Sequence, residues 1–156
     1  MNIFVTNPCP HLSAKYLDDK RVIKMILESA QMLNVALINT YKTDGIGYKL
    51  THVNHPCTKW VCSNSANYTW LYLHFISLCA EYTKRYNKVH KCEQYASTFN
   101  KYIDNSINVS NINFVNCTTY HKHITNVFDA YKAEMAFKWK NDIRVPTKYK
   151  LIIKEF

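Results

Sequence analysis

Apolar side chains recur at three- and four-residue steps between residues 13 and 40, a spacing that places them on one face of a helix. The apolar positions on this face are Val22, Ile26, Ala30, Leu33 and Leu37. Pro8 and Pro10 interrupt regular structure before this segment. We therefore predict a first helix from about Ser13 to about Thr40.

Two further segments also have helical patterns. Residues 56–86 are apolar nearly all round, which predicts a central buried helix with a break near residues 63–65. Residues 121–140 predict the last helix, with its apolar positions toward the core. Residues 41–54, which contain both glycines, and residues 87–116 are expected to form long loops, with one short helix over residues 92–102.

These patterns indicate a mostly α, all-α fold class with about three main helices and long loops. Strand-like alternation is confined to residues 3–5. With 156 residues, 47% of them apolar, the chain can bury one core without disulfides or metal. We expect a compact single domain over residues 1–156.

A polar stripe accompanies the apolar face of the first helix. It consists of Lys20, Arg21, Lys24, Glu28 and Gln31. At ~1.5 Å per residue the stripe is ~16 Å long, enough to follow several phosphates of a nucleic acid backbone. Its single acid, Glu28, lies where it could do proton chemistry on an anionic substrate, or it forms an ordinary surface ion pair with Lys24.

The charge of the chain narrows the class of partner. The formal net charge is +9, and twelve Tyr, seven Phe and three Trp lie between the basic residues. Cations hold phosphates and aromatic rings stack on bases, so this composition favours nucleic acid or a nucleotide as partner. The alternative explanation is that the charges serve solubility and the aromatic residues form a tyrosine-rich core. The sequence has neither a recognisable export signal nor an apolar run long enough to span a membrane. We therefore expect a protein of the cytoplasm whose six cysteines are reduced thiols.

Two other segments carry candidate DNA contacts. Residues 51–60 include His55, Lys59 and Trp60 at a predicted helix start, which suits phosphate or base contact, although a capping histidine beside a core tryptophan fits equally. A second basic run follows a predicted helix C-terminus, where cations also complement the helix dipole. It contains Lys84, Arg85, Lys88, His90 and Lys91.

Histidines and cysteines raise two further possibilities, a zinc site and a phosphoesterase. Candidate ligands are His52, His55, Cys57, Cys62, Cys117, His121 and His123, but no CxxC or HxxxH pair occurs. Residues 11–13 and 123–125 are similar to the paired histidine motifs of two-histidine phosphoesterases, although both fall at predicted helix starts. We predict no metal site and no cofactor.

Three segments resemble the phage pyrimidine-dimer DNA glycosylases and their phage relatives with an NHPC motif. These segments are LDDKRVIKMILESAQML, NHPCTKW and RVPTKYK. The resemblance implies a mostly α fold with the N-terminal segment between the helices, and a basic surface that kinks duplex DNA and flips a nucleotide out. It also implies that the N-terminal amine attacks C1′ to form a Schiff base, that a glutamate on the first helix assists, and that β-elimination follows.

Mapped onto this chain, the resemblance makes Glu28 the catalytic acid, with Asp19 as second choice. The nucleophile would be the amine of Met1 or Asn2. His55, a candidate from the 51–60 segment itself, is expected to lie in the same pocket. The family nucleophile is a threonine exposed by methionine removal, whereas the size of Asn2 normally blocks that removal. The expected DNA contacts are Lys20, Arg21, Lys24, Lys59, Trp60, Arg85, Lys88, His90, Arg144, Lys148 and Tyr149.

The sequence thus predicts a phage-encoded base-excision enzyme, a DNA glycosylase with AP lyase activity, that acts on a damaged or modified base. Two alternatives remain open. The first is a non-catalytic module that binds nucleic acid or a nucleotide. The second is a histidine-based or metal-dependent phosphoesterase.

Overall fold

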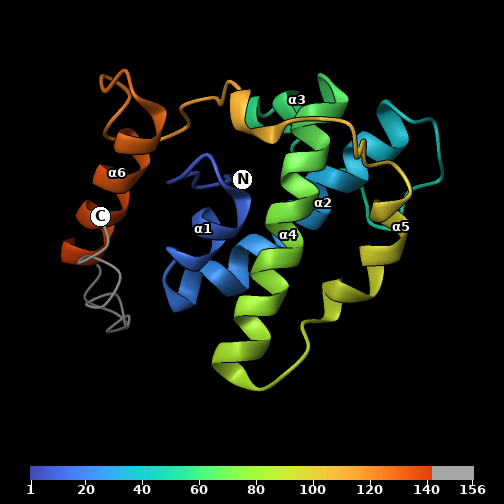
Figure 1. Ribbon diagram of the computed structural model, residues 1–156, viewed down its shortest axis with the longest axis horizontal. Helices are drawn as coiled ribbons and strands as arrows, with labels where there is room; N and C mark the ends of the chain where they lie inside the picture. Colours follow the sequence, from blue (N-terminus) through green and yellow to red (C-terminus); the bar gives the residue numbers. More distant parts are fainter. Residues whose placement is uncertain (142–156) are drawn as a thin grey trace.

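The computed structural model describes residues 1–141, and its regular elements there are all helical, without a strand (Figure 1). The predicted all-α class is therefore confirmed. In order, the elements are α1 (Pro10–Lys15), α2 (Asp19–Asn39), α3 (Pro56–Cys62), α4 (Ser65–Tyr86), the 3-10 helix η1 (Lys91–Tyr95), α5 (Ala96–Asn100), the 3-10 helix η2 (Val109–Asn111) and α6 (Val127–Asn141).

Two predicted helix starts are wrong, and the reason in both cases is an N-cap. The first predicted helix is divided in two, because Asp18 has an extended backbone and its side chain accepts the Arg21 amide at 2.9 Å, so that α2 begins anew. The last helix begins at Val127 rather than near His121. There the Asn126 side chain accepts two amides of the first turn.

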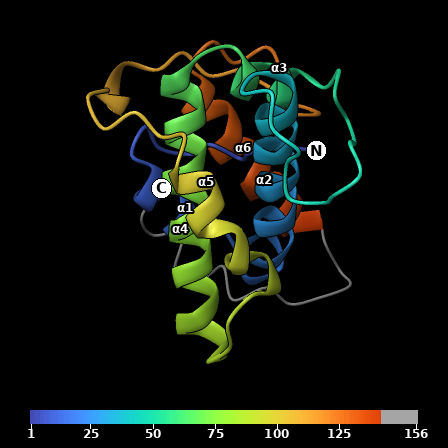
Figure 2. The ribbon, with the colours of Figure 1, turned by 90° about the vertical axis from the view of Figure 1, so that its right-hand side faces the viewer.

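The core lies mainly between α2 and α4, which run side by side in Figure 2. The predicted apolar face of α2 is confirmed, since all five of its residues are fully buried. The predicted break at residues 63–65 is also confirmed, because the Asn64 side chain caps α4. α2 is long and apolar enough to cross a membrane by length and composition, but 67% of its most apolar window is buried within the protein, as in a core helix.

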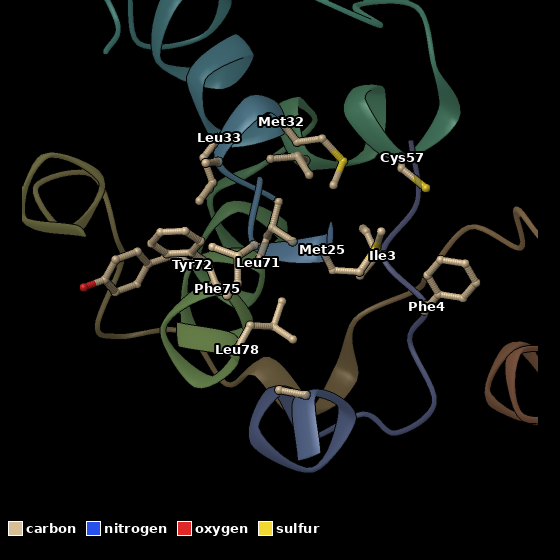
Figure 3. Packing of buried hydrophobic residues seen from close by; sticks show 14 of the residues in the cluster. Ile3, Phe4, Met25, Met32, Leu33, Cys57, Leu71, Tyr72, Phe75 and Leu78 are labelled. Atoms are coloured by element: carbon tan, nitrogen blue, oxygen red, sulfur yellow. The ribbon is translucent and has the colours of Figure 1, made fainter. Parts of the chain in front are cut away.

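The N-terminal segment is extended and passes through the interior, beside α2 and α3 (Figures 1 and 3). Ile3 and Val5 are buried, and Ile3 lies near Met25 in Figure 3. α4 holds the turn that follows, because Trp70 Nε1 donates to the Pro8 carbonyl at 2.7 Å. Residues 3–5 therefore act as core residues without pairing as a strand, which agrees with the threaded N-terminal segment that the resemblance implies.

The last described helix, α6, is joined to the start of α2 by a buried carboxylate. Asp18 is fully buried, and its Oδ2 accepts a hydrogen bond from Trp139 Nε1 at 2.7 Å. The same oxygen forms an ion pair with the Arg21 guanidinium. One aspartate thus caps α2 and fixes α6 against it.

We expect Trp139→Phe to lower the free energy of unfolding by about 1–3 kcal/mol, because the buried Asp18 carboxylate loses a donor while the aromatic bulk is largely kept. Urea denaturation measures this change. Tyr120→Phe, at an exposed aromatic position, is the control and should change stability by no more than about 0.5 kcal/mol. Equal losses in the two variants would show that the Asp18 contact contributes nothing.

Candidate active site

The Glu28 carboxylate lies at the meeting point of α2 and the N-terminus. Its Oε2 accepts the Asn2 amide at 2.8 Å and lies 3.7 Å from the Met1 amine nitrogen. Its Oε1 lies 3.3 Å from Lys24 Nζ. Glu28 is only 8% exposed, so its negative charge is balanced locally by the Met1 and Lys24 cations rather than by water.

Asn2 gives the N-terminus its shape. Its Oδ1 accepts the amides of Ile3 at 2.7 Å and Phe4 at 3.1 Å, which forms a tight turn. Its Nδ2 donates to the Cys117 carbonyl at 3.2 Å. Phe4 has a φ of 56°, in the left-handed region that non-glycine residues seldom adopt, so this turn is held by its contacts rather than by local preference.

His55 lies near the same group of charges. It is the N-cap of α3, where its Nδ1 accepts the Cys57 amide at 3.1 Å, so the predicted capping role is observed. Burial, and after it the nearby N-terminal amine, lowers the pKa of His55, while Glu28 acts in the opposite direction. The structure therefore brings together Met1, Asn2, Glu28 and His55, the predicted catalytic group, with a neutral imidazole at pH 7.

Two cysteines complete the surroundings of His55. Cys57 is buried, Cys117 is partly buried, and their sulfur atoms lie within 4.8 Å of each other. The interaction with the Cys57 thiol lowers the pKa of Cys117 to about 7, whereas the same interaction and burial raise the pKa of Cys57. Both cysteines are among the possible zinc ligands in the sequence, but their proximity has no sequence signal, because no short spacing connects positions so distant in the chain.

Two residues predicted to contact DNA have side chains that make contacts within the fold. The Arg21 side chain is only 12% exposed, pairs with Asp18 and lies over the Phe4 ring. Trp60 is buried, and its Nε1 donates to the Asn113 carbonyl at 2.7 Å. The alternative of a core tryptophan beside a capping histidine is therefore what the structure shows for Trp60.

Arg85 is a third such residue. Its guanidinium pairs with Glu81 at 2.9 Å and with Asp19 at 3.1 Å, and it donates to the Leu17 carbonyl at 2.7 Å. Asp19, the second choice for the catalytic acid, is therefore the partner of this arginine. Arg85 joins the end of α4 to the start of α2 and is not free to hold a phosphate.

The remaining predicted DNA contacts occupy different places. Lys20, Lys24 and Lys59 are exposed on α2 and α3, whereas Lys88 and His90 follow the C-terminal end of α4, a helix ~33 Å long whose other end adjoins α3. His90 is the N-cap of η1. The last predicted contacts, Arg144, Lys148 and Tyr149, lie outside the described residues.

A family model described as pyrimidine dimer DNA glycosylase matches residues 1–94, which is more than half of the chain. The chain belongs to the pyrimidine dimer DNA glycosylase family. No curated protein and no solved structure matches it. The matched residues contain α1 to α4 and all four residues of the predicted catalytic group, whereas Cys117 and α6 follow them. Membership supports a DNA glycosylase role, and with it DNA as a partner.

The cysteine pair gives a test of the electrostatics beside this site. We expect iodoacetamide to alkylate Cys117 of the metal-free protein with a half-maximal rate near pH 7, because its pKa is lowered to about 7 and the thiolate is the reactive form. Peptide mass spectrometry across a pH series measures the rate at each cysteine.

Cys62 is the internal comparison for this measurement. It is also partly buried, but burial raises the pKa of its thiol. Its rate should still be rising above pH 9. Identical pH profiles at Cys62 and Cys117 would contradict the lowered pKa of Cys117.

Proposed function

We propose that this protein is a phage-encoded base-excision enzyme that removes a damaged or modified base from duplex DNA in the host cytoplasm and then cuts the strand as an AP lyase. One observation carries the proposal: the buried Glu28 carboxylate contacts both nitrogen atoms at the start of the chain. The Met1 amine and the carboxylate form an ion pair at 3.7 Å, and a closure of about 0.5 Å when DNA binds would bring them within the reach of proton transfer that a Schiff-base mechanism requires.

In the proposed reaction the target nucleotide is flipped out of the duplex. The neutral N-terminal amine attacks C1′, the glycosidic bond breaks, and the base leaves with a proton. Loss of an amine proton and cleavage of the C1′–O4′ bond, with O4′ taking a proton, give the protonated Schiff base. Removal of a C2′ proton then drives β-elimination, which breaks the C3′–O bond and releases the 3′ phosphate as the leaving group. Glu28 accepts the proton of the ammonium group, whose nitrogen lies 3.7 Å from Oε2.

The amine of Met1 is the proposed nucleophile. Asn2 follows it, and the size of Asn2 normally prevents methionine removal. The Asn2 nitrogen then stays a peptide amide that donates to Glu28 at 2.8 Å, which makes Asn2 a positioning residue. Methionine removal would instead place a free Asn2 amine at the carboxylate, so either form of the chain presents an amine to Glu28.

Borohydride trapping tests this chemistry. The unsubstituted protein should become covalently attached to abasic DNA, and the attached DNA should map to the N-terminal peptide. Glu28→Gln should reduce the trapping rate by about 10²- to 10⁴-fold, the usual contribution of a general acid or base, with DNA affinity nearly unchanged. Glu81→Gln, a comparably ion-paired glutamate on α4, is the matched control and should trap normally.

Three results would contradict the proposed function. DNA binding without any cross-link would identify a non-catalytic module. Phosphodiester hydrolysis that a chelator abolishes, again without a cross-link, would identify a metal-dependent phosphoesterase. Normal trapping by Glu28→Gln would remove Glu28 from the reaction.

The exposed lysines of α2 and α3 are the proposed phosphate contacts, and Lys24 gives the clearest test because its side chain is 65% exposed. We expect Lys24→Ala to lower the slope of log K against log salt concentration by about one, because one phosphate contact and its released counterion are lost. Fluorescence anisotropy with a DNA duplex measures this slope.

Lys42→Ala is the control, because Lys42 is exposed just beyond the opposite end of α2. Its slope should equal that of the unsubstituted protein. An unchanged slope for Lys24→Ala would instead place DNA on another face.

A further inference from the structure

Three side chains of the kinds that bind zinc meet beside the N-terminal segment. His55 and Cys57 come from the start of α3, and Cys117 comes from the segment between η2 and α6. One ligand atom from each lies within 4.8 Å of the other two. Among the described residues, no other group of three histidine, cysteine or acidic side chains is placed to share a metal ion in this way.

We propose that His55, Cys57 and Cys117 form a zinc site, which fastens the segment around Cys117 to the start of α3. Zinc prefers tetrahedral sulfur and nitrogen ligands at ~2.0–2.3 Å, so neighbouring ligand atoms lie ~3.3–3.8 Å apart. Since the ligand atoms lie within 4.8 Å of one another, zinc binding requires a closure of at most about 1.5 Å. Three protein ligands leave one tetrahedral position for water or another donor.

The charges of this site suit its burial. Two cysteine thiolates carry two negative charges, which balance the charge of Zn²⁺ and leave a neutral complex with a neutral imidazole. Cys57 is fully buried, a place where an unbalanced charge would be costly. Sulfur and imidazole ligands together favour zinc over magnesium or calcium, which take oxygen ligands.

One hydrogen bond beside the ligands bears on metal binding. The Cys57 backbone amide donates to His55 Nδ1 at 3.1 Å. A zinc ion bound to this nitrogen would replace the amide as its partner, so the capping hydrogen bond at the start of α3 would be exchanged for a bond to the metal.

Cobalt substitution and metal analysis test the proposal on the full, untagged chain after reduction. The protein should retain one zinc per chain after gel filtration and, with Co²⁺, show the intense absorption of thiolate-to-cobalt charge transfer. Cys117→Ser and His55→Ala should each weaken zinc binding by more than the ~10- to 100-fold that loss of an outer contact costs. Circular dichroism checks that each variant is folded, and Cys117 is the more suitable cysteine because it is only partly buried.

Cys62→Ser is the matched control, since Cys62 is also partly buried but lies outside the cluster, and it should bind zinc as the unsubstituted protein does. The proposal is wrong if the reduced protein retains no zinc and shows no charge-transfer band, or if Cys117→Ser keeps both. These readouts do not involve DNA, so they stand or fall separately from the glycosylase activity.

Discussion

The burial of the Glu28 carboxylate is the constraint on which the N-terminal half of the structure depends. A carboxylate that is nearly removed from water needs donors and opposite charge nearby. Two of its three partners, the Met1 amine and the Asn2 amide, belong to the chain terminus itself. The terminus must therefore lie inside the fold, and the apolar residues that follow it, Ile3 and Val5, become part of the core.

A second buried carboxylate on the same helix holds the opposite end of the described chain. Asp18 caps α2 and accepts the indole of Trp139, whereas Glu28 lies further along α2 and holds the N-terminus. α2 thus fixes both ends of the described chain through acidic side chains rather than through apolar contact alone. Because a buried charge without its partner is costly, each carboxylate also specifies which segment packs against it.

The sequence predicts whatever depends on local periodicity. The buried face of α2 and the break before α4 were both predicted, because burial repeats with the helical period and Asn64 is a recognisable cap. The structural roles of Arg21 and Arg85 are not predicted, since the sequence does not distinguish an arginine that binds a phosphate from one that pairs with an aspartate of the fold. For Arg85, the four-residue spacing from Glu81 is a usable signal of an ion pair within the helix. The meeting of Cys57 with Cys117 depends on tertiary packing and has no local signal.

The Asn2 amide and the Met1 amine lie at unequal distances from Glu28 Oε2, which allows the chain terminus to be both part of the fold and a proposed reactant. The Asn2 amide is held at 2.8 Å, within a normal hydrogen bond, whereas the Met1 amine lies at 3.7 Å, beyond it. The anchor is therefore one residue behind the proposed nucleophile. Under the proposed mechanism, the amine can leave the carboxylate to attack C1′ while the Asn2 amide keeps Glu28 in place. The turn that Asn2 forms with Ile3 and Phe4 persists through such a movement, because none of its hydrogen bonds involves Met1.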